Sequence, residues 1–190
     1  MILAVLLFVA PAETWAQQQP RKDTTIILLH DLKVQLECTQ ALNDLYDFNF
    51  AAAEKQFTYL KSQYRWHPLP YFLMGLIEWW KIMPNTRDLT HDDTFLAYMD
   101  TTIMTAENLY KRYTQYKVEA AFFLSGAYGF KARLYSDEER KQWRKAATAG
   151  KTALNYLEVN RDQTGLSSEL LFGDALYNYF SVWMPENYPA

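Results

Sequence analysis

The chain has a single cysteine, few glycines and prolines, and little excess of charge of either sign. Cys38 is the only cysteine among 190 residues, which excludes an internal disulfide. Six glycines and seven prolines are few for this length and favour helices joined by short turns. The formal net charge is −3 and the basic residues are scattered, so the sequence lacks the basic footprint of a nucleic-acid-binding protein.

The sequence also lacks the motifs on which common enzyme classes depend. It contains no Gly-rich phosphate loop, no His-Glu-x-x-His motif and no Glu-x-x-His motif, and no serine stands in a nucleophile elbow. The best candidate for a metal cluster is His91-Asp92-Asp93. We interpret it as the acidic start of a helix, because no second His or Cys group offers the spacing of metal ligands. We therefore expect no catalytic site, no metal site and no cofactor.

A long apolar run stands at the N-terminus, over residues 2–10. It is too short for a stable bilayer span, and Thr14-Trp15-Ala16 places small residues at the two positions that a signal peptidase reads. We predict a signal peptide over residues 1–16, with an N-terminal core element as the alternative. Residues 17–24 are polar and are predicted to be a disordered lead-in. The mature protein is then expected in the periplasm or cell envelope, without a stable membrane span.

The sequence repeatedly places a small residue within an apolar helical segment. Ala41, Gly75, Gly126 and Gly173 all stand in such segments. Glycine inside a helix costs up to about 1 kcal/mol relative to alanine, so its repeated use indicates the close approach of a second helix. Ala41 and Gly75 are 34 residues apart, which is the period of a two-helix repeat, and the later intervals are longer. We predict that these positions pack neighbouring helices together in an irregular array.

Apolar residues recur at helical spacing along most of the chain and predict an all-α domain over residues 25–184, with a tail at 185–190. On the sixth helix, the predicted buried side consists of Trp143, Ala146, Ala147, Gly150, Leu154 and Leu157. About seven helices are expected: 25–46, 50–64, 69–83, a long helix that starts near residue 90 and carries Phe95 to Tyr110, 118–134, 136–163 and 167–184.

The segment from Leu45 to Phe57 resembles the turn and second helix of a tetratricopeptide repeat (TPR). Phe50, Ala53 and Phe57 match the aromatic, small and aromatic positions of that helix, and Phe48 replaces the glycine usual in the turn. The resemblance extends over about residues 33–83. The whole chain is similar to the irregular repeat arrays of exported, Bacteroidetes-type bacterial envelope proteins. The resemblance implies a right-handed α-solenoid of antiparallel helix pairs that binds proteins or peptides on a concave face. Because no convergent cluster of ionisable residues is found, we also expect that the protein is not an enzyme.

Charged and aromatic side chains on the predicted first helices of the pairs form the predicted binding face, with ordinary solvated surface charge as the alternative. Trp79 and Trp80 are adjacent on a helix and point about 100° apart, so the pair cannot be wholly buried on one side. One of them is expected to be exposed, whereas most other tryptophans are expected in the core. The predicted face consists of Glu78, Trp79, Trp80, Glu119, Lys131, Arg133 and Asp174.

Two functions fit these features. The first is a non-catalytic scaffold or adaptor that binds other proteins or peptides. The alternative is a helical protein that binds carbohydrate or another small ligand, similar in style to the helical glycan-binding lipoproteins of gut bacteria. This alternative predicts two or more exposed aromatic rings in one plane, and it calls for a lipid-attachment cysteine. Cys38 lies too far beyond the leader for that role and is interpreted as a small buried hydrophobic residue.

The predicted last helix, residues 167–184, is apolar nearly all round. Solenoids need a terminal helix with a polar outer face, and a helix that is apolar on every side belongs in an interior. The six residues that follow are too few to supply a second helix for the pair. We therefore expect that no capping helix is present, and that the array continues or the protein self-associates through this helix.

Overall fold

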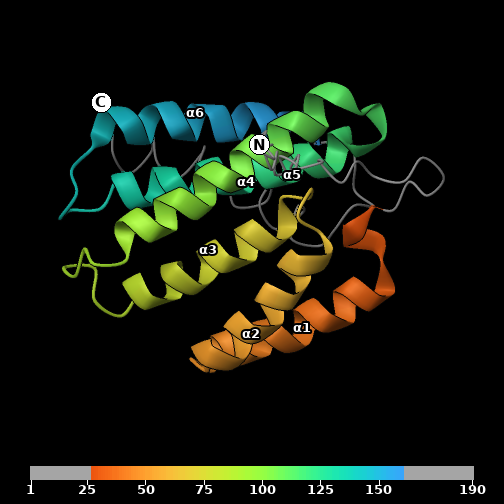
Figure 1. Ribbon diagram of the computed structural model, residues 1–190. Coiled ribbons are helices and arrows are strands. Elements are labelled where there is room, and N and C mark those ends of the chain that lie inside the picture. The colour runs from red at the N-terminus through yellow and green to blue at the C-terminus, as the bar shows by residue number, and fades with distance from the viewer. Residues whose placement is uncertain (1–26, 161–190) are drawn as a thin grey trace, which may run out of the picture.

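The computed structural model describes residues 27–160, which form an all-helical domain, as predicted (Figure 1). The predicted leader, lead-in, seventh helix and tail lie outside the described residues, and so do Gly173, Asp174 and the region in which no capping helix is expected. Within the described residues no β-strand occurs. The elements are η1 (Leu28–His30), α1 (Leu32–Tyr46), α2 (Phe50–Gln63), α3 (Leu69–Ile82), α4 (Asp92–Arg112), η2 (Thr114–Tyr116), α5 (Lys117–Tyr135) and α6 (Trp143–Val159).

The predicted first helix is divided at Asp31. The Asp31 carboxylate accepts a hydrogen bond from the Val34 N–H at 3.0 Å and caps α1. An aspartate in this position satisfies one of the free N–H groups of the first turn, so the helix begins at Leu32. The preceding residues 28–30 form the separate 3-10 turn η1. The bounds of α2, α3 and α5 agree with the predicted ones to within one residue at each end.

The sixth helix begins at Trp143, so the predicted start at residue 136 is wrong. Residues 136–142 form a loop instead, in which the Asp137 carboxylate accepts the Glu139 N–H and Lys141 adopts a left-handed backbone (φ 49°). The predicted buried side of α6 is also partly wrong, because Trp143 is 57% exposed and Leu154 is 41% exposed. The helix packs through small side chains, Ala149 and Ala153, which let it lie close to α5.

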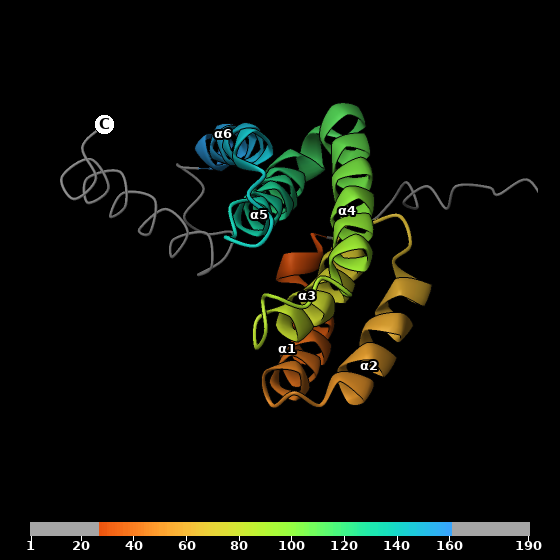
Figure 2. The same ribbon diagram turned by 90° about the vertical axis from the view of Figure 1, so that its left-hand side faces the viewer.

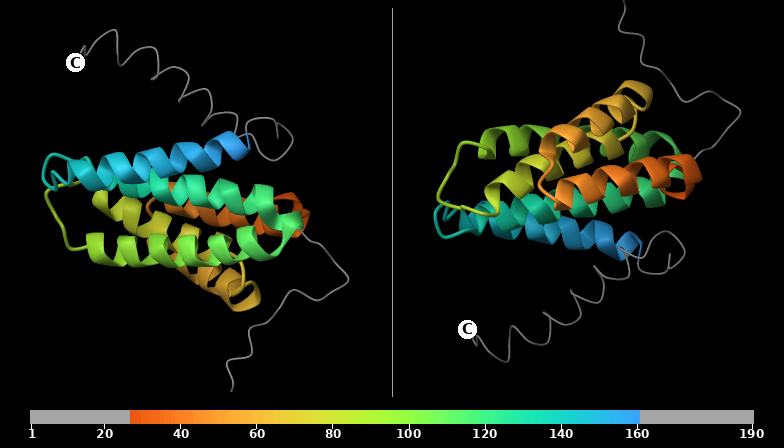
Figure 3. Two further views of the ribbon diagram at one scale, coloured as in Figure 1. Left: turned by 90° about the horizontal axis from the view of Figure 1, so that it is seen from above. Right: turned by 90° about the horizontal axis from the view of Figure 1, so that it is seen from below.

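Each helix packs mainly against its neighbours in the sequence, and α3 also contacts α1 and α5. Figure 2 shows α1 and α2 on one side of α3, with α4, α5 and α6 on the other. Seen from above, α4, α5 and α6 lie side by side (Figure 3). Large fully buried side chains come from most of these elements, among them Leu45, Phe57, Phe95, Tyr116 and Phe123.

The small residues lie where helices approach each other closely. Ala41, Ala53 and the aromatic Phe57 are fully buried. A Cβ atom at position 75 of α3 would lie 2.1 Å from Met99 Cε and 3.3 Å from Tyr98 Cβ, both on α4. A Cβ atom at position 126 of α5 would lie 3.2 Å from the Phe72 ring on α3. Glycine therefore sets the spacing of α3 against α4 and, less tightly, of α5 against α3.

This spacing predicts opposite effects for two glycine-to-alanine substitutions. We expect Gly75→Ala to lower the free energy of unfolding by about 1 kcal/mol. The Met99 methyl can move aside only within a fully buried site, and Tyr98 Cβ, at 3.3 Å and attached to the α4 backbone, must shift as well, so overpacking outweighs the gain in helix propensity. Gly129→Ala is the matched control, because nothing lies within 4 Å of the added Cβ. It should raise the free energy of unfolding by up to about 1 kcal/mol. Urea denaturation followed by circular dichroism measures both values, and a stabilising Gly75→Ala would contradict the close approach.

Among the described residues, no helix combines the length with the mean hydropathy that crossing a bilayer requires.

Candidate functional site

Four aromatic side chains gather where the α1–α2 turn meets the C-terminal half of α3, and we call them the aromatic patch: Tyr46, Phe48, Phe50 and Trp80. The Trp80 ring lies 5.5 Å from the Tyr46 ring and 6.3 Å from the Phe48 ring, centroid to centroid, and Phe48 lies 5.8 Å from Phe50. Each of these pairs meets edge to face. Tyr46 and Phe48 are each 53% exposed, and Phe50 and Trp80 are half-buried. The chain thus exposes part of a connected aromatic cluster to solvent.

Phe48 occupies a backbone conformation that is costly for its side chain. Its φ is 59°, in the left-handed region, where a residue with a Cβ atom costs roughly 1–2 kcal/mol relative to the right-handed region. Glycine avoids this cost. The turn is closed by hydrogen bonds from the Phe48 N–H to the Leu45 carbonyl (3.0 Å) and from the Asn49 N–H to the Asp44 carbonyl (2.8 Å). The backbone of this turn therefore favours glycine, yet the sequence places a half-exposed phenylalanine there.

The adjacent tryptophans divide between core and surface. Trp79 is buried and its ring contacts Phe95 of α4 and Phe130 of α5. The Trp80 ring belongs to the aromatic patch, where it contacts the rings of Tyr46 and Phe48. Only Trp80 is therefore available as a contact residue, and Trp79 does not belong to an exposed face.

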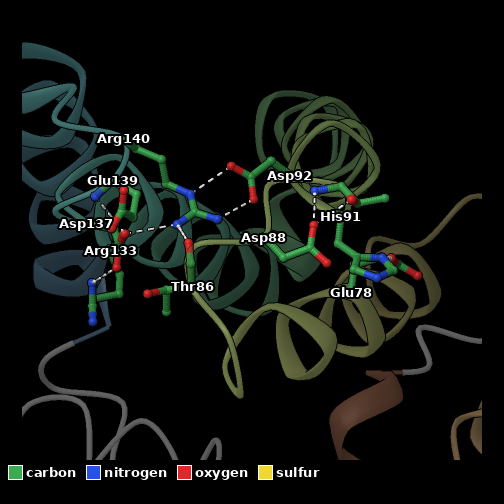
Figure 4. A network of polar contacts seen from close by, with 10 residues as sticks. Glu78, Thr86, Asp88, His91, Asp92, Arg133, Asp137, Glu139 and Arg140 are labelled. Atoms are coloured by element: carbon green, nitrogen blue, oxygen red, sulfur yellow. Dashed lines mark hydrogen bonds and ion pairs between the residues drawn. The ribbon is translucent and has the colours of Figure 1, made fainter.

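Glu78 stands just before the two tryptophans on α3, and both of its carboxylate oxygens already contact neighbouring side chains. Its Oε2 lies 2.7 Å from His91 Nδ1 (Figure 4). Its Oε1 lies 2.7 Å from Lys81 Nζ, and the residue itself is buried. Lys81 Nζ also lies 5.8 Å from the centroid of the Phe50 ring. The carboxylate therefore positions Lys81 and the start of α4, and it is not a free acidic group of a binding face.

Glu119 does not lie on an exposed face, contrary to expectation. Its side chain is fully buried in the first turn of α5, where Oε1 accepts the Leu29 N–H at 2.9 Å. Oε2 lies 3.3 Å from Nε2 of His67, which is also fully buried; this is a close polar contact whose geometry does not make a hydrogen bond. Because His67 Nδ1 accepts the Leu69 N–H at 3.1 Å, the imidazole proton resides on Nε2 and faces Glu119. Through these two contacts, Glu119 of α5 holds η1 and the α2–α3 turn in place.

Of the predicted face, the two other charged residues that the structure describes, Lys131 and Arg133, form ion pairs. Lys131 is largely buried and pairs with Asp100 of α4, and Arg133 lies 3.8 Å from Asp137. Asp137 in turn belongs to a network around Arg140, which Figure 4 shows. These contacts join helices and loops, so they do not form one concave row of binding charges.

Arg140 joins two loops at one end of the domain. Its side chain is 3% exposed; Nε donates to Asp92 Oδ2 at 2.7 Å and Nη2 to Asp92 Oδ1 at 2.5 Å, a bidentate pair. Nη1 donates to the Thr86 carbonyl at 2.7 Å and to Asp137 Oδ1 at 2.9 Å. The hydrogen bond to Asp92 raises the pKa of Arg140. The loop before α4 is thereby fixed to the loop before α6 (Figure 4).

The sequence cluster His91-Asp92-Asp93 does not converge on a common point. His91 turns to Glu78, Asp92 turns to Arg140, and Asp93 is exposed. Between residues 27 and 160, no group of three or more His, Cys, Asp or Glu side chains is placed to hold a metal ion.

The single cysteine, Cys38, is half-buried on α1. Burial and, to a smaller extent, the neighbouring Glu37 charge raise the pKa of the Cys38 thiol to about 12. The thiol therefore stays protonated at neutral pH and is a poor nucleophile.

The sequence pattern predicts Trp80 on the binding face but does not predict Tyr46 or Phe48 there. A signal is present at Phe48, where the TPR-like turn departs from glycine. Comparison with other proteins adds no assignment, since no protein-family model, curated protein or solved structure matches the chain. A function for this chain must therefore be inferred from its own residues and their geometry.

Proposed function

We propose that this protein is a non-catalytic scaffold or adaptor of the bacterial envelope that binds a protein or peptide through the aromatic patch. The observation that carries the proposal is Phe48, a half-exposed aromatic residue held in a left-handed turn. Strained backbone positions persist where the surrounding structure enforces them, and they cluster at functional sites. Exposed aromatic clusters supply large contact areas at low conformational cost, which suits a binding anchor.

We further propose that the helices form a TPR-like solenoid of antiparallel pairs. Two features support this arrangement. Each helix packs mainly on its sequence neighbours, and α3 contacts both α1 and α5, the helices at equivalent places in the repeat. Arrays of this kind present extended surfaces to partners, because each repeat contacts only its neighbours. The leader-like sequence of residues 1–16 supports export to the periplasm or cell envelope.

The alternative, carbohydrate or small-ligand binding, also draws on the exposed aromatic rings. Ring geometry favours a peptide, however. Trp80 meets Tyr46 at 79° and Phe48 at 86°, and Phe48 meets Phe50 at 85°, so none of these three neighbouring pairs is coplanar. Perpendicular rings suit an irregular side chain better than the flat face of a sugar.

Selection of peptides on the full chain tests the proposal. A phage-displayed random peptide library is selected on the wild-type protein, and the enriched peptides are synthesised and measured by calorimetry. We expect Phe48→Gly to weaken binding about tenfold or more, while the free energy of unfolding changes by no more than about 1 kcal/mol, because relief of backbone strain offsets the lost ring contacts.

Trp80→Ala should weaken binding similarly, and Met104→Ala, which removes an exposed side chain from α4, should leave it unchanged. Peptides that bind all variants equally would overturn the proposal. A glycan array with the same variants tests the alternative, which gains support if sugars bind the wild type and Trp80→Ala abolishes that binding.

A further inference from the structure

The charges around the aromatic patch are unbalanced. Asp44 accepts hydrogen bonds from Asn49 Nδ2 at 3.2 Å and from Gln56 Nε2 at 2.9 Å, and both donors are neutral amides. Asp47 is exposed and lies between two residues of the patch in the sequence. Among the described residues, no cation pairs with either carboxylate. The C-terminal end of α1 therefore carries two carboxylates, Asp44 and Asp47, that the described part of the chain leaves without a counter-ion.

Lys81, the cation that lies over a ring of the patch, is not available to neutralise these carboxylates. Lys81 lies beside Phe50, but its ammonium group binds Glu78 at 2.7 Å. The patch thus combines electron-rich aromatic faces with uncompensated negative charge at the C-terminal end of α1. Aromatic rings attract cations through their quadrupole, and a nearby carboxylate adds to that attraction.

We infer that the patch recognises a basic side chain, a lysine or arginine within a peptide segment of the partner, with apolar neighbours of that residue resting on Tyr46 and Phe48. This inference rests on the proposed function and specifies its partner. An acidic anchor is disfavoured because it would meet Asp44 and Asp47. A purely apolar segment would leave both carboxylates without a partner and is the alternative outcome of the test.

The peptides selected on the wild-type protein provide the probe. We expect them to be enriched in lysine or arginine, and replacement of that residue by glutamine should weaken binding about three- to tenfold, the range of a cation–π contact with a nearby charge. Asp47→Asn should weaken binding of the basic peptide about two- to fivefold and leave its glutamine version unchanged. Raising sodium chloride from about 50 mM to about 500 mM should weaken only the basic peptide.

Glu138→Gln serves as the control, since it removes an exposed carboxylate from the loop between α5 and α6. It should not change the affinity of either peptide. If patch-dependent peptides carry no basic residue, or if Asp47→Asn acts equally on both versions, the inference fails while the proposed function stands. If no peptide depends on Phe48 and Trp80, the proposed function fails with it.

Discussion

Replacement of Arg140 by alanine is expected to lower the free energy of unfolding by about 3 kcal/mol. The guanidinium is almost fully buried and bonds two carboxylates and one backbone carbonyl (Figure 4). Its removal leaves Asp92 and the Thr86 carbonyl without this donor, whereas Asp137 keeps the Glu139 N–H and the 3.8 Å contact with Arg133. Breaking a buried ion pair on one side costs roughly 3–5 kcal/mol because the remaining charge loses its compensation. Urea denaturation measures the loss.

Two further variants separate this network from ordinary surface charge. Arg140→Lys keeps the charge but cannot reproduce the bidentate bond to Asp92, so it should recover only part of the stability. Arg87→Ala removes an 86% exposed arginine that lies 3.7 Å from Glu139, and it should change the free energy of unfolding by less than about 0.5 kcal/mol. Equal effects of Arg140→Ala and Arg87→Ala would show that Arg140 does not hold the two loops together.

Glu119→Ala is expected to lower the free energy of unfolding by about 3–4 kcal/mol. The substitution removes the acceptor of the Leu29 N–H and leaves the His67 Nε2–H buried without a nearby oxygen. A buried N–H that loses its acceptor, here that of Leu29, costs about 1–3 kcal/mol, and the vacated volume together with the lost polar contact to His67 adds to this cost. Amide hydrogen exchange should report the same event locally, as faster exchange at Leu29.

Glu119→Gln tests which property of the side chain matters. The amide oxygen can still accept the Leu29 N–H, so this variant should lose less stability than Glu119→Ala and should keep Leu29 protected from exchange. Glu37→Ala is the control for a surface carboxylate, since its 3.8 Å pair with Lys33 is solvated, and it should cost less than about 1 kcal/mol. A loss at Glu119→Ala no larger than at Glu37→Ala would contradict a structural role for the buried pair.

The sequence predicted helices well where local signals act alone. Pro68 and Pro70 mark the start of α3, and the apolar stripe of α4 is long and regular, from Phe95 to Leu109. It failed at residues 136–142, where acidic residues suggested a helix start. Their side chains bond the loop and Arg140 instead, and Arg140 is held by Asp92, 48 positions earlier in the chain. No local pattern reveals such a long-range contact.

The candidate site could also be predicted only where a local signal exists. Adjacent tryptophans on a helix must diverge, which pointed to Trp79 or Trp80. The identity of the exposed member depends on which side α4 and α5 cover. Glutamate is usually a surface residue, so the sequence predicted Glu119 on an exposed face. Its buried position depends on the hydrogen bond that it accepts from the backbone N–H of Leu29, 90 positions earlier in the chain.

The contacts of Glu119 and those of Arg140 lie near opposite ends of α5. Glu119 stands in its first turn and binds η1 and the α2–α3 turn, whereas Arg140 follows its last turn and binds the loop before α4. A helix anchored near both ends resists sliding along its own axis, the small shear by which packed helices usually accommodate a ligand. The domain should therefore act as a stiff template. In an encounter with a flexible peptide, the entropy lost on ordering would come from the peptide, and complexes with different peptides should leave the helices in the same relative positions.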